Sequence, residues 1–160
     1  MKGKAREITP AEALMRLETL CAKAEHCRWE LRRKLTLWKI APAAADDIMQ
    51  RLVDNRFVDD ARFARAFARD KFMFAGWGRR KIEAHLRARC IPQPLIAAAL
   101  AEGIDPAQYE AAARALVERR AAAMPDADTY QGRTRLFRAV AARGFEPELV
   151  ARLIRALSQK

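Results

Sequence analysis

Side chains of the types that carry out catalysis are few in this sequence, and their spacing does not assemble a reactive site. The three cysteines, Cys21, Cys27 and Cys90, form no C-x-x-C pair, and the two histidines are His26 and His85. This set does not supply the four-ligand spacing of a structural zinc site. His26 and Cys27 are adjacent, so on a helix their side chains would point apart. We therefore expect structural thiols in a reducing compartment and no metal site.

The acidic pair Asp59-Asp60 has two interpretations. It could bind a metal ion, or it could begin a helix, where carboxylates accept hydrogen bonds from free N–H groups and meet the helix dipole. We favour the second interpretation. The six glycines form no phosphate-binding loop and mostly mark helix boundaries. The sequence thus predicts no catalytic residues, no cofactor and no enzymatic activity.

Basic side chains are the remaining candidates for chemistry. The chain has 31 Lys and Arg against 20 Asp and Glu, a net charge of +11. The excess recurs, since residues 28–39, 78–90 and 133–143 each carry a net charge of +4. The candidate binding residues in these segments are Arg28, Arg32, Arg33, Lys34, Arg79, Arg80, Lys81, Arg87, Arg89, Arg133, Arg135, Arg138 and Arg143.

A basic stripe of this kind has two possible ligands. It can follow a phosphate backbone through counterion release, or it can meet an acidic protein surface. The plain alternative is that these side chains are the solvated faces of amphipathic helices. A base-reading helix-turn-helix is disfavoured because Asn and Gln, which read adenine edges, are nearly absent from these segments. Trp29, Trp38 and Trp77 could stack on bases.

The elements that position these residues are all predicted to be helices. Ala, Leu, Arg and Glu dominate, β-branched residues are sparse, and no stretch alternates with a period of two. Caps and prolines divide the chain into nine helices: about 10–24, 28–39, from 42, from 59–60 to before Gly76, 78–90, from 92–94 to 103, 105–123, 130–143 and 146–158. In the fourth helix, Phe63, Phe67 and Phe74 mark the expected buried stripe.

An internal repeat groups these helices into threes. Leu31, Ile82 and Leu136 correspond at offsets of 51 and 54 residues. The same offsets relate three further sets: Leu35, Leu86 and Val140; Ile40, Ile91 and Phe145; Arg28, Arg79 and Arg133. A three-helix unit of this size is too small to fold well alone and should stack on its neighbour. We predict a flexible segment at 1–8, repeats at 9–56, 57–104 and 105–160, and an all-α stack of three-helix repeats that lines the basic helices into one stripe.

Targeting features are not evident. No stretch reaches the ~18 apolar residues of a membrane span, and the positive N-terminus is not followed by the apolar region of a secretory signal. We expect a cytoplasmic protein without a membrane partner.

Three stretches resemble the RecX family. Its signature is matched by Phe57-Val58-Asp59-Asp60-Ala61-Arg62-Phe63-Ala64 with Phe67 and Lys71, its next helix by Gly78, Lys81-Ile82, Leu86 and Ile91, and the helix of its first repeat by Glu30-Leu31-Arg32-Arg33-Lys34-Leu35. The resemblance runs from about residue 11 to residue 157, and the third repeat matches loosely. Cys90 replaces the usual Gly before Ile91, which puts the local geometry of that helix end in question.

The resemblance implies a function that the residues alone do not. RecX proteins are tandem three-helix repeats that form an elongated, curved body, and the resemblance implies the same shape here. They associate with RecA, lodge in the groove of its filament on single-stranded DNA and limit its activities in homologous recombination, DNA repair and the SOS response. They also bind DNA and bring no catalytic residues. By resemblance we expect a monomer whose partners are RecA, the RecA–single-stranded DNA filament and DNA. The alternatives are a sequence-independent DNA-binding protein and a helical adaptor for another acidic partner.

Overall fold

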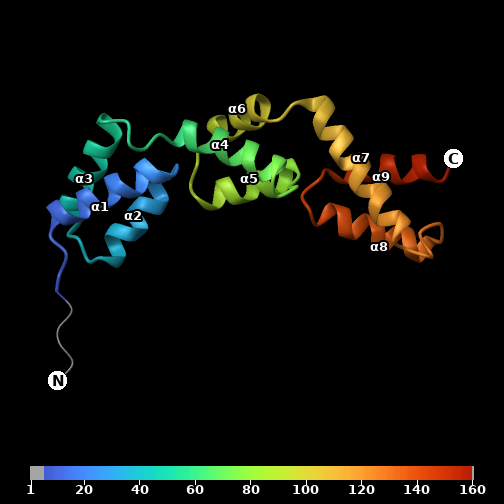
Figure 1. The fold of residues 1–160 in the computed structure, drawn as a ribbon, viewed down its shortest axis with the longest axis horizontal. Helices are drawn as coiled ribbons and strands as arrows, with labels where there is room; N and C mark the ends of the chain where they lie inside the picture. Colours follow the sequence, from blue (N-terminus) through green and yellow to red (C-terminus); the bar gives the residue numbers. More distant parts are fainter. Residues whose placement is uncertain (1–5, 160) are drawn as a thin grey trace, which may run out of the picture.

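The computed structural model describes residues 6–159, which form an elongated arch of nine helices (Figure 1). The helices are α1 Pro10–Lys23, α2 Arg28–Leu37, α3 Pro42–Asp54, α4 Asp60–Met73, α5 Arg79–Ala88, α6 Gln93–Gly103, α7 Pro106–Ala122, α8 Tyr130–Ala141 and α9 Pro147–Leu157. We call α1–α3 unit 1, α4–α6 unit 2 and α7–α9 unit 3.

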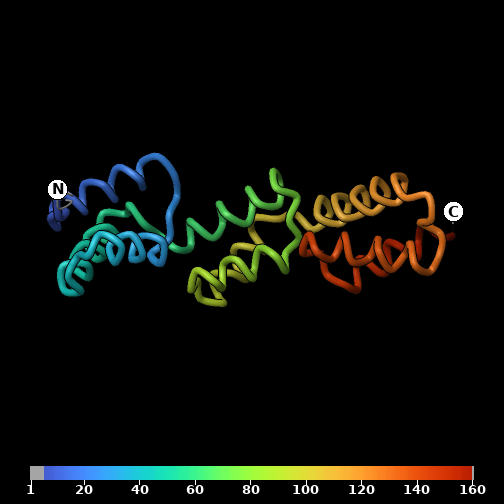
Figure 2. The backbone as a smooth tube through the Cα atoms, turned by 90° about the horizontal axis from the view of Figure 1, so that it is seen from below, coloured from blue at the N-terminus to red at the C-terminus, as the bar shows by residue number. Residues whose placement is uncertain are grey.

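The predicted fold class is confirmed. The described residues contain helices and no strands, and the three units follow one another along a curved body (Figure 2). The repeat boundaries at 9–56, 57–104 and 105–160 stay predictions. Of the segment predicted to be flexible, residues 1–5 lie outside the described residues, while Ile8 packs against the core of unit 1.

Side-chain caps begin the helices where the sequence placed them. Thr9 and Glu12 form a capping box: the Thr9 hydroxyl accepts from the Glu12 N–H at 3.2 Å, and the Thr9 N–H donates to the Glu12 carboxylate at 3.1 Å. At α4, the carboxylate of Asp59 accepts from the Arg62 N–H at 3.0 Å. The capping interpretation of Asp59 is therefore confirmed.

One backbone conformation recurs after the second helix of every unit. Lys39, Cys90 and Gly144, which are equivalent in the repeat, have φ values of 57°, 57° and 98°. In unit 2 this left-handed residue lets the Ile91 N–H reach the Leu86 carbonyl at 3.2 Å, as in a Schellman ending. Gly fits such a position without strain, but Lys39 and Cys90 carry a Cβ there. Replacing the family's glycine by Cys90 thus keeps the local geometry.

The buried side chains form two clusters. Leu17, Leu31 and Leu52 belong to a core confined to unit 1 and the short segments that flank it, from Ile8 to Val58. Units 2 and 3 share a second core, which runs without interruption from Phe63 to Ile154 and also includes Cys27 of unit 1. Packing therefore makes units 2 and 3 one body and leaves unit 1 as a second.

One residue of the expected buried stripe in α4 was wrongly predicted. Phe63 is buried and Phe67 half-buried, but Phe74 is 84% exposed. Phe74 is the C-cap residue, beyond the last turn of the helix, whereas Phe72 points into the core. A periodic pattern carried past the end of a helix no longer reports burial.

The junction between units 2 and 3 is built from backbone groups. The Gly78 N–H donates to the Arg143 carbonyl at 2.8 Å, and the Arg80 N–H donates to the Gly144 carbonyl at 3.0 Å. This approach requires glycine on both sides, because a Cβ on Gly78 would collide with the backbone of Gly144 and one on Gly144 would collide with Lys81.

Tyr109 of α7 completes this junction. Its ring is buried between Phe72 and Phe145, at centroid distances of 5.6 and 5.2 Å. Its hydroxyl donates to Glu146 at 2.6 Å and accepts from the Arg79 N–H at 3.0 Å. Burial and the hydrogen bond to Glu146 raise the pKa of Tyr109 above its ordinary value.

Unit 1 is joined to unit 2 mainly through polar groups. Arg62 donates to Glu25 at 2.6 Å. The Asp60 carboxylate accepts from the Arg28 N–H at 2.9 Å, so a residue of α4 caps the first turn of α2. Buried Cys27 adds an apolar contact here, and burial raises the pKa of its thiol to about 11.

Candidate nucleic-acid and filament interface

The three basic helices lie on the same side of the molecule. In Figure 1, α2, α5 and α8 each form the lower edge of their unit, along the concave side of the arch. Seen from below, they follow one another along its length (Figure 2). We call the surface over α2, α5 and α8 the hollow side. The structure thus brings the predicted basic segments together on one side instead of scattering them.

The thirteen predicted residues differ in how many of their charges remain available. Six side chains form no ion pair within residues 6–159 and hold no neighbouring unit: Arg28, Arg33, Lys34, Arg80, Lys81 and Arg138. A seventh, Arg133, donates to the backbone carbonyl of Asp128 at 2.5 Å, which leaves its charge without a carboxylate. Each unit contributes at least two of these seven.

Three further residues pair with carboxylates of their own unit. Arg32 donates to Asp46 at 2.8 Å and Arg87 to Glu83 at 2.6 Å. Arg135 pairs with Asp126. Exposed pairs of this kind add little to stability and dissociate readily, but each carboxylate lowers the local positive potential. These three positions are weaker candidates for contact with an anion.

The last three predicted residues join the units. Arg89 donates to Glu30 of unit 1 at 3.1 Å. Arg143, its equivalent in the repeat, donates to the Ala75 carbonyl of unit 2. The same position in units 2 and 3 therefore reaches back to the preceding unit.

Arg79 has a similar structural role. Its guanidinium lies 3.9 Å from the centroid of the Tyr109 ring and 3.7 Å from the Glu146 carboxylate. The charge pattern in the sequence identified Arg79, Arg89 and Arg143 as basic candidates. It could not distinguish arginines that join neighbouring units from arginines that face solvent.

Sequence reasoning missed an aromatic cluster in unit 2, where α4, α5 and the loop between them meet. Trp77 packs against His85 at a centroid distance of 4.5 Å and against Phe67 at 6.2 Å. Lys71 and Lys81 place their Nζ atoms 4.9 and 4.6 Å from the centroid of the Trp77 ring. The available signals were Lys71 in the RecX-like stretch and Trp77, already a candidate for stacking on bases, but residues from α4, α5 and the loop between them meet only in the fold.

A second tryptophan, Trp29, lies on the hollow side of unit 1. The Arg33 guanidinium covers its ring at 4.7 Å. Together with Lys34 and Leu37, which is exposed, these residues line an open hollow on α2. Trp38, by contrast, is half-buried against the core of unit 1, with Arg16 over its ring at 5.7 Å.

The cysteines take three different positions. Cys27 is buried at the junction of units 1 and 2, Cys21 is half-buried, and Cys90 is exposed at the end of α5. Burial raises the pKa of Cys21, as it does that of Cys27. In the part of the chain that the structure describes, no three His, Cys, Asp or Glu residues are grouped as metal ligands would be.

Known proteins resemble this chain over most of its length. Regulatory protein RecX of Thermobifida fusca is 33% identical over 150 residues, which cover 91% of this chain and 80% of the relative. Regulatory protein RecX of Xanthomonas axonopodis pv. citri is 36% identical over 143 residues, covering 88% of this chain and 83% of the relative. The chain belongs to the RecX family. Residues 59–100 match the family model described as the second three-helix domain of RecX.

Solved structures support the same fold. The crystal structure of RecX from Lactobacillus salivarius superposes with a TM-score of 0.80 at 18% identity, covering 94% of this chain and 97% of the other. A second RecX crystal structure gives a TM-score of 0.79 at 17% identity, covering 90% of this chain and 70% of the other. The relatives are named regulatory proteins, and this chain is a RecX-type regulator. Among residues 6–159, no helix is both long enough and apolar enough to span a bilayer.

Proposed function

We propose that this RecX protein binds RecA and the RecA filament on single-stranded DNA and limits RecA activity, with its hollow side toward the filament. The observation that carries the proposal is the placement of α2, α5 and α8 on one side, each with cations that no carboxylate neutralises. Arg33, Arg80 and Arg138 supply one exposed example in each unit. A filament of protein wound on a polyanion offers phosphates and acidic side chains along a long path, which suits cations spaced along an arch.

Membership of the RecX family supports RecA as the partner, and the charge pattern supports the surface. The protein acts as a non-enzymatic regulator in the cytoplasm, and as a monomer its three units provide the length of the contact. Direct binding to DNA follows from the same cations, through release of counterions from the phosphate backbone.

The proposal is tested by reversing one available cation in each unit. The triple variant Arg33→Glu, Arg80→Glu and Arg138→Glu should bind RecA–single-stranded DNA filaments at least about tenfold more weakly, because each reversal replaces attraction to a phosphate or carboxylate by repulsion. The matched control reverses Arg51, Arg119 and Arg155, which are exposed on α3, α7 and α9 and form no ion pair within residues 6–159.

Circular dichroism checks that both variants keep their helix content, and co-sedimentation with filaments measures binding. If the triple variant and its control bind filaments equally well, the hollow side is not the interface. A pull-down with RecA in the absence of DNA, and a comparison of filaments with bare single strands at the same salt, separate the alternatives. No preference for filaments would favour a sequence-independent DNA-binding protein, and little affinity for either would favour an adaptor for another acidic partner.

A further inference from the structure

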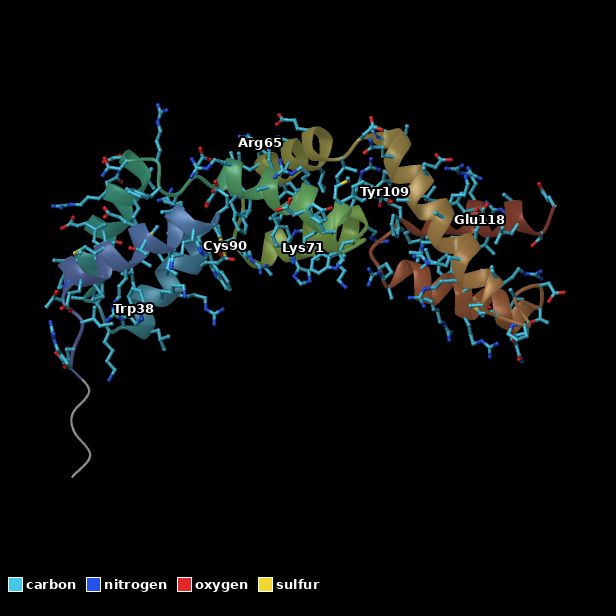
Figure 3. All side chains as sticks on the ribbon, viewed as in Figure 1. Trp38, Arg65, Lys71, Cys90, Tyr109 and Glu118 are labelled. Atoms are coloured by element: carbon cyan, nitrogen blue, oxygen red, sulfur yellow. The ribbon has the colours of Figure 1, made fainter. Side chains whose placement is uncertain are left out.

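The aromatic cluster of unit 2 has an unusual charge arrangement. Trp77 and Phe67, both half-buried, are surrounded by Lys71 from α4 and by Lys81 and His85 from α5. Lys71 lies beside α5 toward the hollow side of the arch (Figure 3). The two lysine ammonium groups contact the π faces of rings, and neither forms an ion pair within residues 6–159.

The cluster therefore holds positive charge that a ring neutralises only in part. Arg89 covers Phe67 at 5.1 Å, but Glu30 pairs with it. Lys71 has only the quadrupoles of the Trp77 and Phe67 rings, and Lys81 only that of Trp77. A ring quadrupole attracts a cation and cannot cancel its charge. Burial first, and then the charges of Arg89, Lys81 and Lys71, hold the pKa of His85 below its ordinary value. The lowered pKa of His85 reflects the same crowding of cations.

We propose that this cluster binds one nucleotide of a single-stranded nucleic acid, with a base stacked on Trp77 and the adjoining phosphates held by Lys71 and Lys81. The inference rests on the proposed function, because it names the nucleic-acid contact that the hollow side would make. In the unliganded protein the two ammonium groups cover the ring. On binding, each turns on its flexible stem from the ring to a phosphate, and the face of Trp77 that it leaves takes the base.

This exchange favours a nucleic acid over an acidic peptide. A phosphate gives a lysine a full opposite charge in place of a ring quadrupole, and a base gives the indole a flat partner in place of an ammonium. An acidic peptide satisfies the lysines but offers nothing flat to Trp77. A duplex hides the faces of its bases in the stack, so a single strand is the form that fits.

The site is accessible to solvent. Phe67 and Lys71 also line an open groove that continues along α4 to Phe74 and reaches Ala24 and Glu25 at the end of α1.

The first experiment observes Trp77 directly. In a Trp29→Phe, Trp38→Phe protein, the fluorescence of the remaining tryptophan is followed while oligothymidylate or an abasic strand of the same length is added. Thymidylate should quench Trp77, while the abasic strand should bind in a salt-dependent way with little quenching. Equal quenching by both strands, or anisotropy-detected binding of thymidylate without quenching, would overturn the proposal. Equal quenching by oligoglutamate at matched charge and salt would assign the cluster to an acidic protein surface instead.

The second experiment uses the protein with its other tryptophans in place. Trp77→Leu keeps an apolar side chain in the cluster and should weaken binding of labelled oligothymidylate by about tenfold while leaving binding of the abasic strand unchanged. The double variant Lys71→Gln, Lys81→Gln should weaken both strands and lower the slope of log affinity against log salt by about 1.4, at about 0.7 per phosphate. The matched control, Lys23→Gln with Arg119→Gln, removes two charges from α1 and α7 and should leave the slope unchanged.

An equal loss on both strands for Trp77→Leu, or an unchanged slope for the double lysine variant, would refute the site. Filament binding is measured in parallel for every variant. If the protein binds RecA filaments but Trp77→Leu causes no base-dependent loss of strand binding, only the proposed nucleotide site is refuted. If the protein binds no filaments at all, the proposed function is refuted. The nucleotide site could still be tested in that case, by base-dependent quenching of Trp77 on bare strands.

Discussion

Replacing Cys90 by glycine should stabilise the protein. Cys90 is exposed and follows α5 with a φ of 57°, in the left-handed region. A residue with a Cβ gives up about 1–2 kcal/mol in this conformation. Glycine removes that strain, but its greater freedom in the unfolded chain returns about 0.4–1 kcal/mol. The expected net gain in the free energy of unfolding is about 0.5–1 kcal/mol.

The assay is urea unfolding followed by far-ultraviolet circular dichroism, together with a thermal melt. For a chain of this size the gain corresponds to an increase in Tm of roughly 1–4 °C, at about 2–4 °C per kcal/mol. Cys90→Ala is the matched control, because it removes the thiol and keeps the Cβ, and it should gain nothing. If alanine stabilises as much as glycine, the thiol and not the backbone is responsible, and the reasoning fails.

Three other changes probe the junctions. Gly78→Ala should lower stability by about 1–3 kcal/mol in urea melts, because its Cβ meets the Gly144 backbone; Gly103→Ala, whose nearest contact would be an ordinary 3.4 Å, should cost far less. Tyr109→Phe should cost about 1–3 kcal/mol by the same assay, since it leaves Glu146 and the Arg79 N–H without their partner. Raising the pH should destabilise the native protein between about 9 and 11, because burial raises the pKa of Cys27 from 9.0 to about 11 and the unfolded chain ionises first; Cys27→Ala should lose that part of the pH dependence, and an unchanged profile would contradict it.

The sequence was sufficient for the parts of the fold that depend on local chemistry. Prolines, caps such as Thr9 and Asp59, and apolar spacing located the helices to within a few residues, because each signal acts within one or two turns. The repeat of Leu31, Ile82 and Leu136 then grouped the helices into units. Apolar spacing failed to predict burial at Phe74, because the spacing continued beyond the end of the helix.

The candidate site was predicted less completely. Thirteen basic residues were found by composition, yet Arg79, Arg89 and Arg143 join the units and three others pair with nearby carboxylates. Their partners, such as Glu30 and Glu146, lie 59 and 67 residues away from Arg89 and Arg79 in sequence, and no local pattern reports such a contact. The same holds for the Trp77 cluster, in which Lys71 of α4 and Lys81 of α5 reach the same ring only when α4 packs against α5.

The two junctions differ in kind, and this difference bears on the proposed contact with a filament. Units 2 and 3 share a core and a backbone contact between Gly78 and Gly144, so their relative orientation can change only by breaking close packing. Unit 1 is connected largely through Arg62–Glu25 and Arg89–Glu30, pairs whose strength falls as salt rises. The orientation of units 2 and 3 is thus the more firmly fixed, and the junction with unit 1 is the more sensitive to salt. If the protein binds a filament as proposed, contact would begin on the closely packed units 2 and 3, where the Trp77 cluster lies, and would extend to unit 1 across its polar junction.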